Sequence, residues 1–418
     1  MDNEHLENKE HSSRGVRKVL TRLEDERDEK LDVVISTGRQ VEPIDRPAAA
    51  SLSLIKPRPW GERNFLPGEI HIDSKYYGED VGLFFKTPDI PELDNHFVAI
   101  TDHAHTQIAQ RAKIPTAYYR RMLADQPDLL VENVATWWEA EPENRLLRTI
   151  GVGGDYSAKS GRVRAFLSSK YRTLDNYDFV QAVLEEVEKA DAEIVDASLD
   201  DERLYMRLVT PIEGEISEGD VVRLGIAIRN SEVGDGSVSV QPWVDRLVCG
   251  NGMIAPTKYN RMHLGSKLDL GVLSSDTINL ENQAIWSQVT DWVKYALNPD
   301  NLHEIIGRFQ AAKQVRNEAP AKIAVGNIVK RHSLNGTEAN SVYERFLRAA
   351  GSGEGDTQFA MVNAVTSAAN GDMSMRRSSE LQEVGGALLH LDGPDWQKFV
   401  GAPIAEKQLG SLFAQHAA

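Results

Sequence analysis

The fold is decided by residues 162–253, above all by three segments: 176–189, NYDFVQAVLEEVEK; 203–209, RLYMRLV; and 221–230, VVRLGIAIRN. The apolar residues of the first segment recur on one face at the helical period, which predicts an amphipathic helix: Phe179, Val180, Val183, Leu184 and Val187. The other two segments alternate apolar and polar residues, the period of a half-buried strand. A helix packed on an antiparallel sheet satisfies both patterns.

Strand-like segments continue on both sides of these three. Residues 192–198 and 237–248 extend the antiparallel meander, and a glycine-rich turn separates a strand that ends near Ile150 from another at 163–168. The segments after residue 271 show helical periodicity instead. The predicted fold class is therefore α+β: a basic β-hairpin, an amphipathic helix and an antiparallel β-meander core, with an all-helical C-terminal region.

The composition divides the chain into four parts. Residues 1–50 are dense in charge and poor in aromatics, which predicts a mostly disordered charged tail with a transient helix from Arg14 to Lys30. Residues 51–140 form a small α/β N-terminal region, residues 141–270 the α+β core, and residues 271–418 the helical C-terminal region.

Charge is distributed unevenly along the chain. The net charge is −16, which opposes binding to phosphate backbones. From Arg145 to Arg172, however, seven basic residues stand against one acid, whereas from Asp175 to Asp220 fifteen acids stand against three bases. This asymmetry favours a local basic surface on the hairpin and an acidic helix behind it, although two unrelated solvated faces would give the same pattern.

Basic and aromatic residues of the core are the candidate nucleic-acid contacts. The hairpin supplies cations and tyrosines, the polar face of the meander supplies three arginines that would line a groove, and the loop after Met253 adds two cations. The candidate residues are Arg145, Arg148, Tyr156, Lys159, Arg162, Arg164, Lys170, Tyr171, Arg172, Arg207, Arg223, Arg229, Lys258 and Arg261.

Residues 105–123 have the outline of a helix-turn-helix. Ile114-Pro115-Thr116 interrupts two short helical patterns, and a DNA-binding pair would present Tyr119 and the two arginines after it. Any two packed short helices give the same outline. His103 and His105 form a His-x-His pair without a further ligand at helical spacing, so we expect no metal there.

Other features narrow the class of protein. A single cysteine, Cys249, excludes internal disulfides and cysteine-based zinc sites and fits a reducing compartment. There is no run of eighteen apolar residues and no secretory signal pattern, so we expect a cytoplasmic protein with no membrane partner. We find no cofactor motif and expect no cofactor.

Several motifs together resemble a known family. They are residues 164–168 (RAFLS) with Tyr171-Arg172, Asp175-Asn176, residues 225–234 (GIAIRNSEVG), residues 246–253 (RLVCGNGM) and residues 362–366 (VNAVT). Together they resemble a phage/plasmid-like family known as a domain of unknown function, over residues from about 70 to 390. The order of hairpin, helix, meander and helical region also looks like the core of phage single-strand annealing proteins of the Redβ, RecT and Erf kind. This second resemblance implies rings or filaments that hold one DNA strand without using nucleotide.

The sequence-based hypothesis is therefore a non-enzymatic protein of phage or prophage origin that binds and anneals single-stranded DNA in recombination, as a homo-oligomeric ring or filament. One alternative is a non-enzymatic assembly or interaction protein of a mobile element, whose acidic surface meets a basic partner. A second alternative is a metal-dependent nucleic-acid enzyme, for which Asp175, Asp178 and His103 are the scattered candidates.

Overall fold

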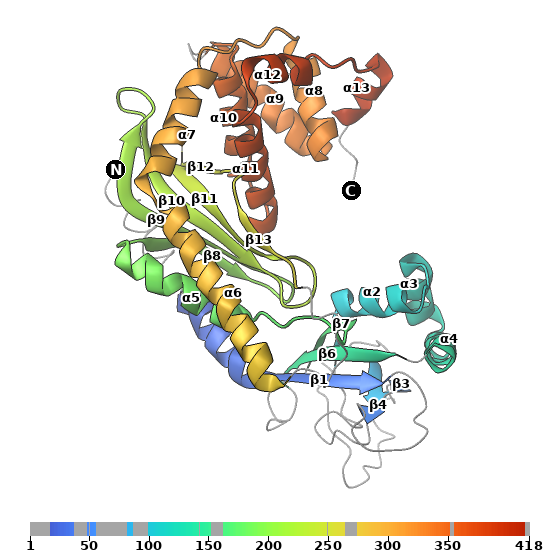
Figure 1. The fold of residues 1–418 in the computed structure, drawn as a ribbon. Helices are drawn as coiled ribbons and strands as arrows, with labels where there is room; N and C mark the ends of the chain where they lie inside the picture. The colour runs from blue at the N-terminus through green and yellow to red at the C-terminus, as the bar shows by residue number, and fades with distance from the viewer. Residues whose placement is uncertain are drawn as a thin grey trace.

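The computed structural model describes residues 17–36, 48–49, 51–55, 82–86, 99–141, 143–151, 162–248, 250–263, 274–351 and 355–413. The fold contains a mixed sheet and an antiparallel sheet, both covered by helices, and a helical region follows them in the chain (Figure 1). The predicted α+β class with a helical C-terminal region is confirmed. Among the described residues, no helix is long and apolar enough to cross a lipid bilayer.

The first sheet contains the predicted hairpin. Its strands run in the order β2-β1-β6-β7-β5, and β6 pairs antiparallel with both β1 and β7. The bounds are β1 Lys30–Ser36, β2 Ala48–Ala49, β5 Ala99–Ile100, β6 Asn144–Ile150 and β7 Arg162–Ser168. A separate pair, β3 Ser51–Ile55 and β4 Gly82–Lys86, lies apart from this path. The hairpin tip with Tyr156 and Lys159, like Cys249, falls outside the described residues.

The disordered tail predicted for residues 1–50 is wrong for residues 17–36. Residues 17–29 form a helix that buries Val19 and Leu23, and β1 then adds a strand beside the hairpin. The prediction failed because the charged side chains of this segment form hydrogen bonds and ion pairs with the rest of the protein. Arg22 donates to the carbonyl of Leu199 at 2.8 Å, and Lys30 pairs with Glu232 at 2.6 Å. These polar contacts add to the burial of Val19 and Leu23, so the segment packs on the sheets with few apolar residues.

The second sheet is the predicted meander, in the order β12-β11-β10-β9-β8, with β13 pairing beside β12 on β11. Its bounds are β8 Glu193–Leu199, β9 Leu204–Glu215, β10 Val221–Asn230, β11 Val238–Arg246, β12 Asn251–Ile254 and β13 Tyr259–Arg261. The register places Ile226 opposite Leu208 and Ile228 opposite Met206. Apolar side chains therefore stack on one face along neighbouring strands.

That apolar face is covered by three helices. Helix 17–29, α5 (Asn176–Lys189) and α6 (Ser275–Ala296) pack on it around Phe179, Ile226 and Val289 (Figure 1). The predicted amphipathic helix is thus confirmed, with Val183 and Val187 also buried. The acids of this helix, Glu185, Glu186 and Glu188, were predicted to face solvent, but Glu186 is buried and pairs with Lys189 and Lys294, because α6 lies against α5.

The opposite face of the meander is covered too. Helix α11 (Met375–Leu389) lies on it, and Gln382 accepts a hydrogen bond from the Trp243 indole at 3.1 Å. Gly386 allows this approach, since a Cβ there would lie 1.9 Å from the carbonyl oxygen of Ile254. The groove expected on this arginine-bearing face is therefore filled where α11 packs.

The C-terminal helices share one core with the end of the meander. Phe309, Phe359 and Trp396 pack with Val222 and Leu224 of β10. The remaining bounds are α7 Pro299–Ala312, α8 Ala321–His332, α9 Gly336–Gly351, α10 Gln358–Ala368, α12 Gly393–Val400 and α13 Glu406–Leu412. The boundary expected at residue 270 does not hold, because α6 belongs to the core of the second sheet.

Three further helices cover the first sheet. They are α2 Asp102–Arg111, α3 Thr116–Asp125 and α4 Pro127–Ala140. Trp138 of α4 stacks on Phe166 of β7 with ring centroids 5.2 Å apart. The boundary expected at residue 140 therefore also fails, since the helices before it and the hairpin after it form one core.

Candidate functional site

The two sheets meet at the loop that joins β10 to β11, residues 231–237, here called the junction loop. The side chain of Glu232, the second residue of this loop, is fully buried. It binds Lys30 at 2.6 Å and Arg164 at 2.9 Å, and it accepts the main-chain N–H of Asn176 at 2.7 Å. One carboxylate thus ties the first sheet and the start of α5 to the second sheet.

Positive charge around Glu232 controls its ionisation. Burial alone would raise the pKa of this carboxyl, but the charges of Arg148, Lys30 and Arg164 outweigh burial and lower that pKa to about 2. Arg148 itself is 3% exposed and binds Asp32 at 3.0 Å and Asp175 at 2.6 Å. Arg148 and Arg164 are therefore structural ion-pair partners, which corrects their assignment as phosphate contacts.

Most other predicted basic contacts are also engaged within the protein. Arg207 is buried, and it binds Ser378 and Ser379 of α11. Five more arginines carry ion pairs: Arg145 with Glu143, Arg162 with Asp201, Arg172 with Glu281, Arg223 with Asp245 and Arg229 with Glu383. The crevice between α11 and the sheet beside Arg207 and Arg229 has a volume of only about 10 Å³, room for about one water molecule and not for a nucleotide. The expected groove floor is closed.

Three of the predicted cations are exposed: Lys170, Lys258 and Arg261. The segments that carry them are neighbours, because the N–H of Arg172 donates to the carbonyl of His263 at 3.3 Å. Tyr171 lies between them but does not offer a free ring. It stacks on His263 with centroids 5.1 Å apart, and its hydroxyl donates to the carbonyl of Ser231.

The helix-turn-helix outline yields two helices, α2 and α3, but of the three expected DNA-facing residues only Arg121 is largely exposed, with 76% of its side chain accessible to solvent. Tyr119 is fully buried and bonds to His105 at 2.9 Å. Burial raises the pKa of Tyr119 and lowers the pKa of His105 to about 4, so both groups are neutral at pH 7. Arg120 is paired with Asp102. The pair of helices acts as packing for the first sheet.

An aromatic cleft opens on the outer side of these helices. It has a volume of about 220 Å³ and lies between the α2–α3 turn and α4. Tyr118 and Trp137 line it, and each is 48% exposed. Trp138, the next residue, is 2% exposed. Adjacent tryptophans on a helix point about 100° apart, so one enters the core and the other faces the cleft.

Charged side chains rim the same cleft. Arg111 and Lys113 both pair with Glu141, at 3.5 and 3.2 Å, and Arg111 also reaches Glu143 at 2.9 Å. The Lys113 ammonium and the Arg111 guanidinium hold the pKa of the Glu141 carboxyl below its usual range. Among the lining residues the cations outnumber the anion, and the Lys113 side chain is 73% exposed. The cleft therefore combines ring faces with a cation that solvent reaches.

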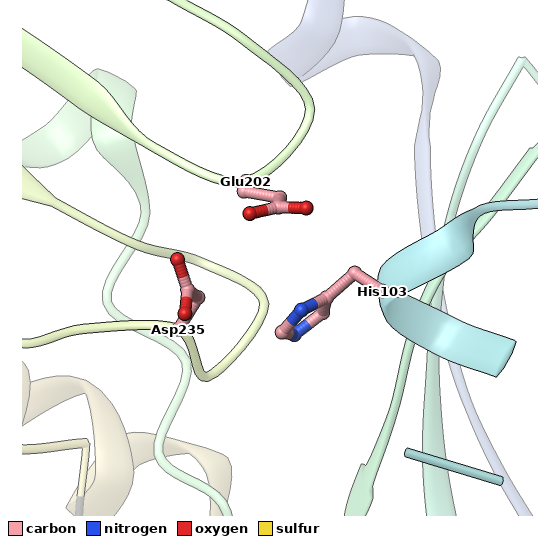
Figure 2. A group of neighbouring side chains, drawn as sticks. All are labelled: His103, Glu202 and Asp235. Carbon is pink, nitrogen blue, oxygen red and sulfur yellow. The ribbon is translucent and has the colours of Figure 1, made fainter. Parts of the chain in front are cut away.

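A second cluster lies at the junction loop. His103 of α2, Glu202 of the β8–β9 turn and Asp235 of the junction loop turn toward one another (Figure 2). One ligand atom from each lies within 4.8 Å of the other two. Among the described residues, this is the group of three such side chains close enough to hold a metal ion. Arg203 and Arg376 pair with Asp235 at 2.6 and 3.1 Å.

The comparisons with known proteins give no neighbour: no family model, no curated protein and no solved structure matches the chain. The resemblance to a phage/plasmid-like family stays a prediction.

Sequence reasoning missed both sites for different reasons. The cleft had a signal in the adjacent Trp137 and Trp138, but helical phase alone does not say which ring is exposed. The cluster gives no signal in the spacing of its residues. Glu202 lies about 100 residues after His103 and about 30 residues before Asp235, and the three meet only where the two sheets join. Asp175, a candidate for catalysis, is held instead by Arg148.

Proposed function

We propose that this protein binds single-stranded nucleic acid, as a non-enzymatic annealing protein of phage or prophage origin would, and that the aromatic cleft is the contact site. One observation carries the proposal: Tyr118 and Trp137 are both exposed and line one cleft with Lys113, whose side chain is 73% exposed. Proteins that bind single strands combine stacking rings with cations along the backbone. The three arginines predicted to line a groove on the meander offer less to a ligand, because the side chains of Arg207, Arg223 and Arg229 are 10%, 28% and 23% exposed.

The size of the cleft suits one nucleobase. At about 220 Å³ it is smaller than the 300–1,000 Å³ typical of drug-sized ligands. Under this proposal a base stacks on Trp137 or Tyr118 and a phosphate meets Lys113. The exposed Lys170, Lys258 and Arg261 are candidates for further phosphates on a longer strand.

The test is fluorescence anisotropy of a labelled oligonucleotide over a series of salt concentrations. Trp137→Ala and Tyr118→Ala should each weaken binding by about 5- to 160-fold, since one base stacked on an aromatic ring contributes roughly 1–3 kcal/mol. Lys113→Gln should lower the salt slope by about one. Tyr295→Ala is the matched control, because Tyr295 lies on α6 and is also 48% exposed.

Two outcomes would contradict the proposal. One is an absence of salt-dependent binding by the folded wild-type protein. The other is binding that both cleft variants retain at the level of Tyr295→Ala. A double variant, Lys258→Gln with Arg261→Gln, shows whether a longer strand reaches β13, because its effect should grow with oligonucleotide length.

A second candidate function, assembly, has its own observation. Leu129 and Trp137 lie eight residues apart on α4 and are both exposed, so α4 presents two apolar side chains to solvent. Under this proposal these two side chains join copies of the chain into an oligomer. Sedimentation of the wild type and Leu129→Glu over a range of concentrations tests it: a single monomeric species for both excludes assembly through Leu129.

A further inference from the structure

We propose that His103, Glu202 and Asp235 form a binding site for one divalent transition-metal ion, Zn²⁺ or Mn²⁺. The geometry is close to what an ion needs. Three atoms that lie within 4.8 Å of one another leave a central point no more than about 2.8 Å from each of them. Ligand distances of about 2.0–2.2 Å then require inward shifts of roughly 0.6–0.8 Å, within the reach of side-chain torsions.

The donor set points to the class of ion. One imidazole with two carboxylates suits Zn²⁺ or Mn²⁺, whereas Mg²⁺ and Ca²⁺ prefer oxygen ligands alone. The three ligands come from α2, the β8–β9 turn and the junction loop. A bound ion would therefore cross-link the first sheet's helix layer to two turns of the second sheet.

Neighbours of His103 orient its ring. Nε2 lies 2.9 Å from the carbonyl oxygen of Val233 and 2.8 Å from the Gln107 side-chain nitrogen, so Nδ1 is the nitrogen left for the two carboxylates (Figure 2). The Gln107 amide is itself fixed, since its oxygen accepts the N–H of Phe166 at 2.7 Å. In the tautomer that binds the ion, Nε2–H and the Gln107 amide both donate to the carbonyl oxygen of Val233, and Nδ1 carries a lone pair, the arrangement common behind metal-bound histidines. In the other tautomer the Gln107 amide donates to Nε2, and the proton on Nδ1 must leave when the ion binds.

Asp235 is also prepared by a neighbour. Arg203 and Arg376 both bind its Oδ2 atom, which leaves Oδ1 outside these two ion pairs. Arg203 is largely buried and also bonds to the main-chain oxygen of Asp235 and to the Tyr205 hydroxyl, so it would stay and hold the carboxylate in place.

Arg376 is the competitor of the ion. Its guanidinium lies 3.1 Å from Asp235 and 3.8 Å from Glu202, so it neutralises part of the negative charge that would attract an ion. Its side chain is 43% exposed and also pairs with Glu380 on its own helix at 3.4 Å. When the ion binds, Arg376 can turn to Glu380. The two acids and two arginines sum to zero charge, and withdrawal of Arg376 leaves one negative charge facing the ion.

The test is isothermal titration of the untagged, chelator-treated protein with Zn²⁺, Mn²⁺ or Mg²⁺ alone. We expect one equivalent of Zn²⁺ to bind more tightly than Mn²⁺, and Mg²⁺ to bind least. His103→Ala and Glu202→Gln should each weaken Zn²⁺ binding at least tenfold. Arg376→Gln should strengthen it several-fold, an effect that loose binding elsewhere on the surface would not produce. The control is His303→Ala, since His303 is an exposed histidine on α7.

A second measurement does not depend on whether the substituted variants of the site fold. In ¹⁵N-histidine spectra, Zn²⁺ should shift the ring signals of His103, and the shift should persist in His303→Ala. Absence of Zn²⁺ binding by the folded wild type would overturn the proposal. So would wild-type affinity in both His103→Ala and Glu202→Gln, which would place the ion elsewhere. Weaker binding by Arg376→Gln would refute the competition between the arginine and the ion.

Discussion

Replacing Glu232 with glutamine tests the central role of the junction loop. The substitution keeps the shape of the side chain and an oxygen to accept the N–H of Asn176, but it removes the charge that Lys30 and Arg164 face. Loss of one partner from a buried ion pair costs about 3–5 kcal/mol of unfolding free energy, because the remaining charges stay desolvated. We therefore expect Glu232→Gln to fold with markedly lower stability.

The lowered pKa of Glu232 gives the sign of the pH dependence, since Arg148, Lys30 and Arg164 favour its charged form in the folded protein. Because the folded-state pKa lies below the unfolded value, this stability is complete above about pH 4.5 and is lost as the pH falls toward 2. The difference between wild type and Glu232→Gln should therefore be largest at pH 7 and shrink at pH 3.

Urea unfolding followed by circular dichroism at pH 7 and pH 3 measures both effects. Glu188→Gln is the control, since Glu188 lies on the exposed side of α5. We expect the control to unfold within about 0.5 kcal/mol of the wild type. A Glu232→Gln protein as stable as the control at pH 7, or a stability difference that does not change with pH, would refute the role of the buried charge.

Two further predictions concern packing and burial. Gly386→Ala should lower the unfolding free energy by about 1–3 kcal/mol or more, because the new methyl would strike the backbone at Ile254, whereas Gly410→Ala on α13, where no atom lies within 4 Å, should not destabilise the protein in the same urea assay. Burial lowers the pKa of His263 to about 4, below its ordinary 6.5, so its ring should stay neutral at pH 5.5 and stability should be lost as the pH falls from 6.5 to 4; an NMR titration midpoint near 6.5 would contradict this.

Local patterns were enough to predict the helix α5, the hairpin and the meander, because each buries one face of a regular period against its neighbours in sequence. The packing of helix 17–29 into the core and the strand β1 were missed, since their charged residues meet partners more than 100 residues away, such as Glu232 for Lys30. A window of sequence contains only the charge and not its partner, so such a segment looks unable to pack.

The candidate nucleic-acid residues failed in a related way. Arg148 and Arg164 lie on predicted strands, but the acids that neutralise them lie on β1, at the N-cap of α5 and in the junction loop. The sequence predicts the strands, yet which face of the first sheet is covered depends on how the two sheets meet. Trp137 was visible as an aromatic residue, and its exposure became clear only from the docking of α4.

The pairing of β1 with β6 has a consequence for how the chain folds. Lys30 lies opposite Ile150, 120 residues away, whereas Arg229 lies opposite Ser239, only 10 residues away. Loop closure costs free energy that grows with the logarithm of length, so the first contact is about 2 kcal/mol more costly in chain entropy than the second. The meander therefore has the lower contact order, and we expect it to form early in folding. We expect the first sheet to be completed later, when β1 pairs with β6 of a hairpin that has already formed.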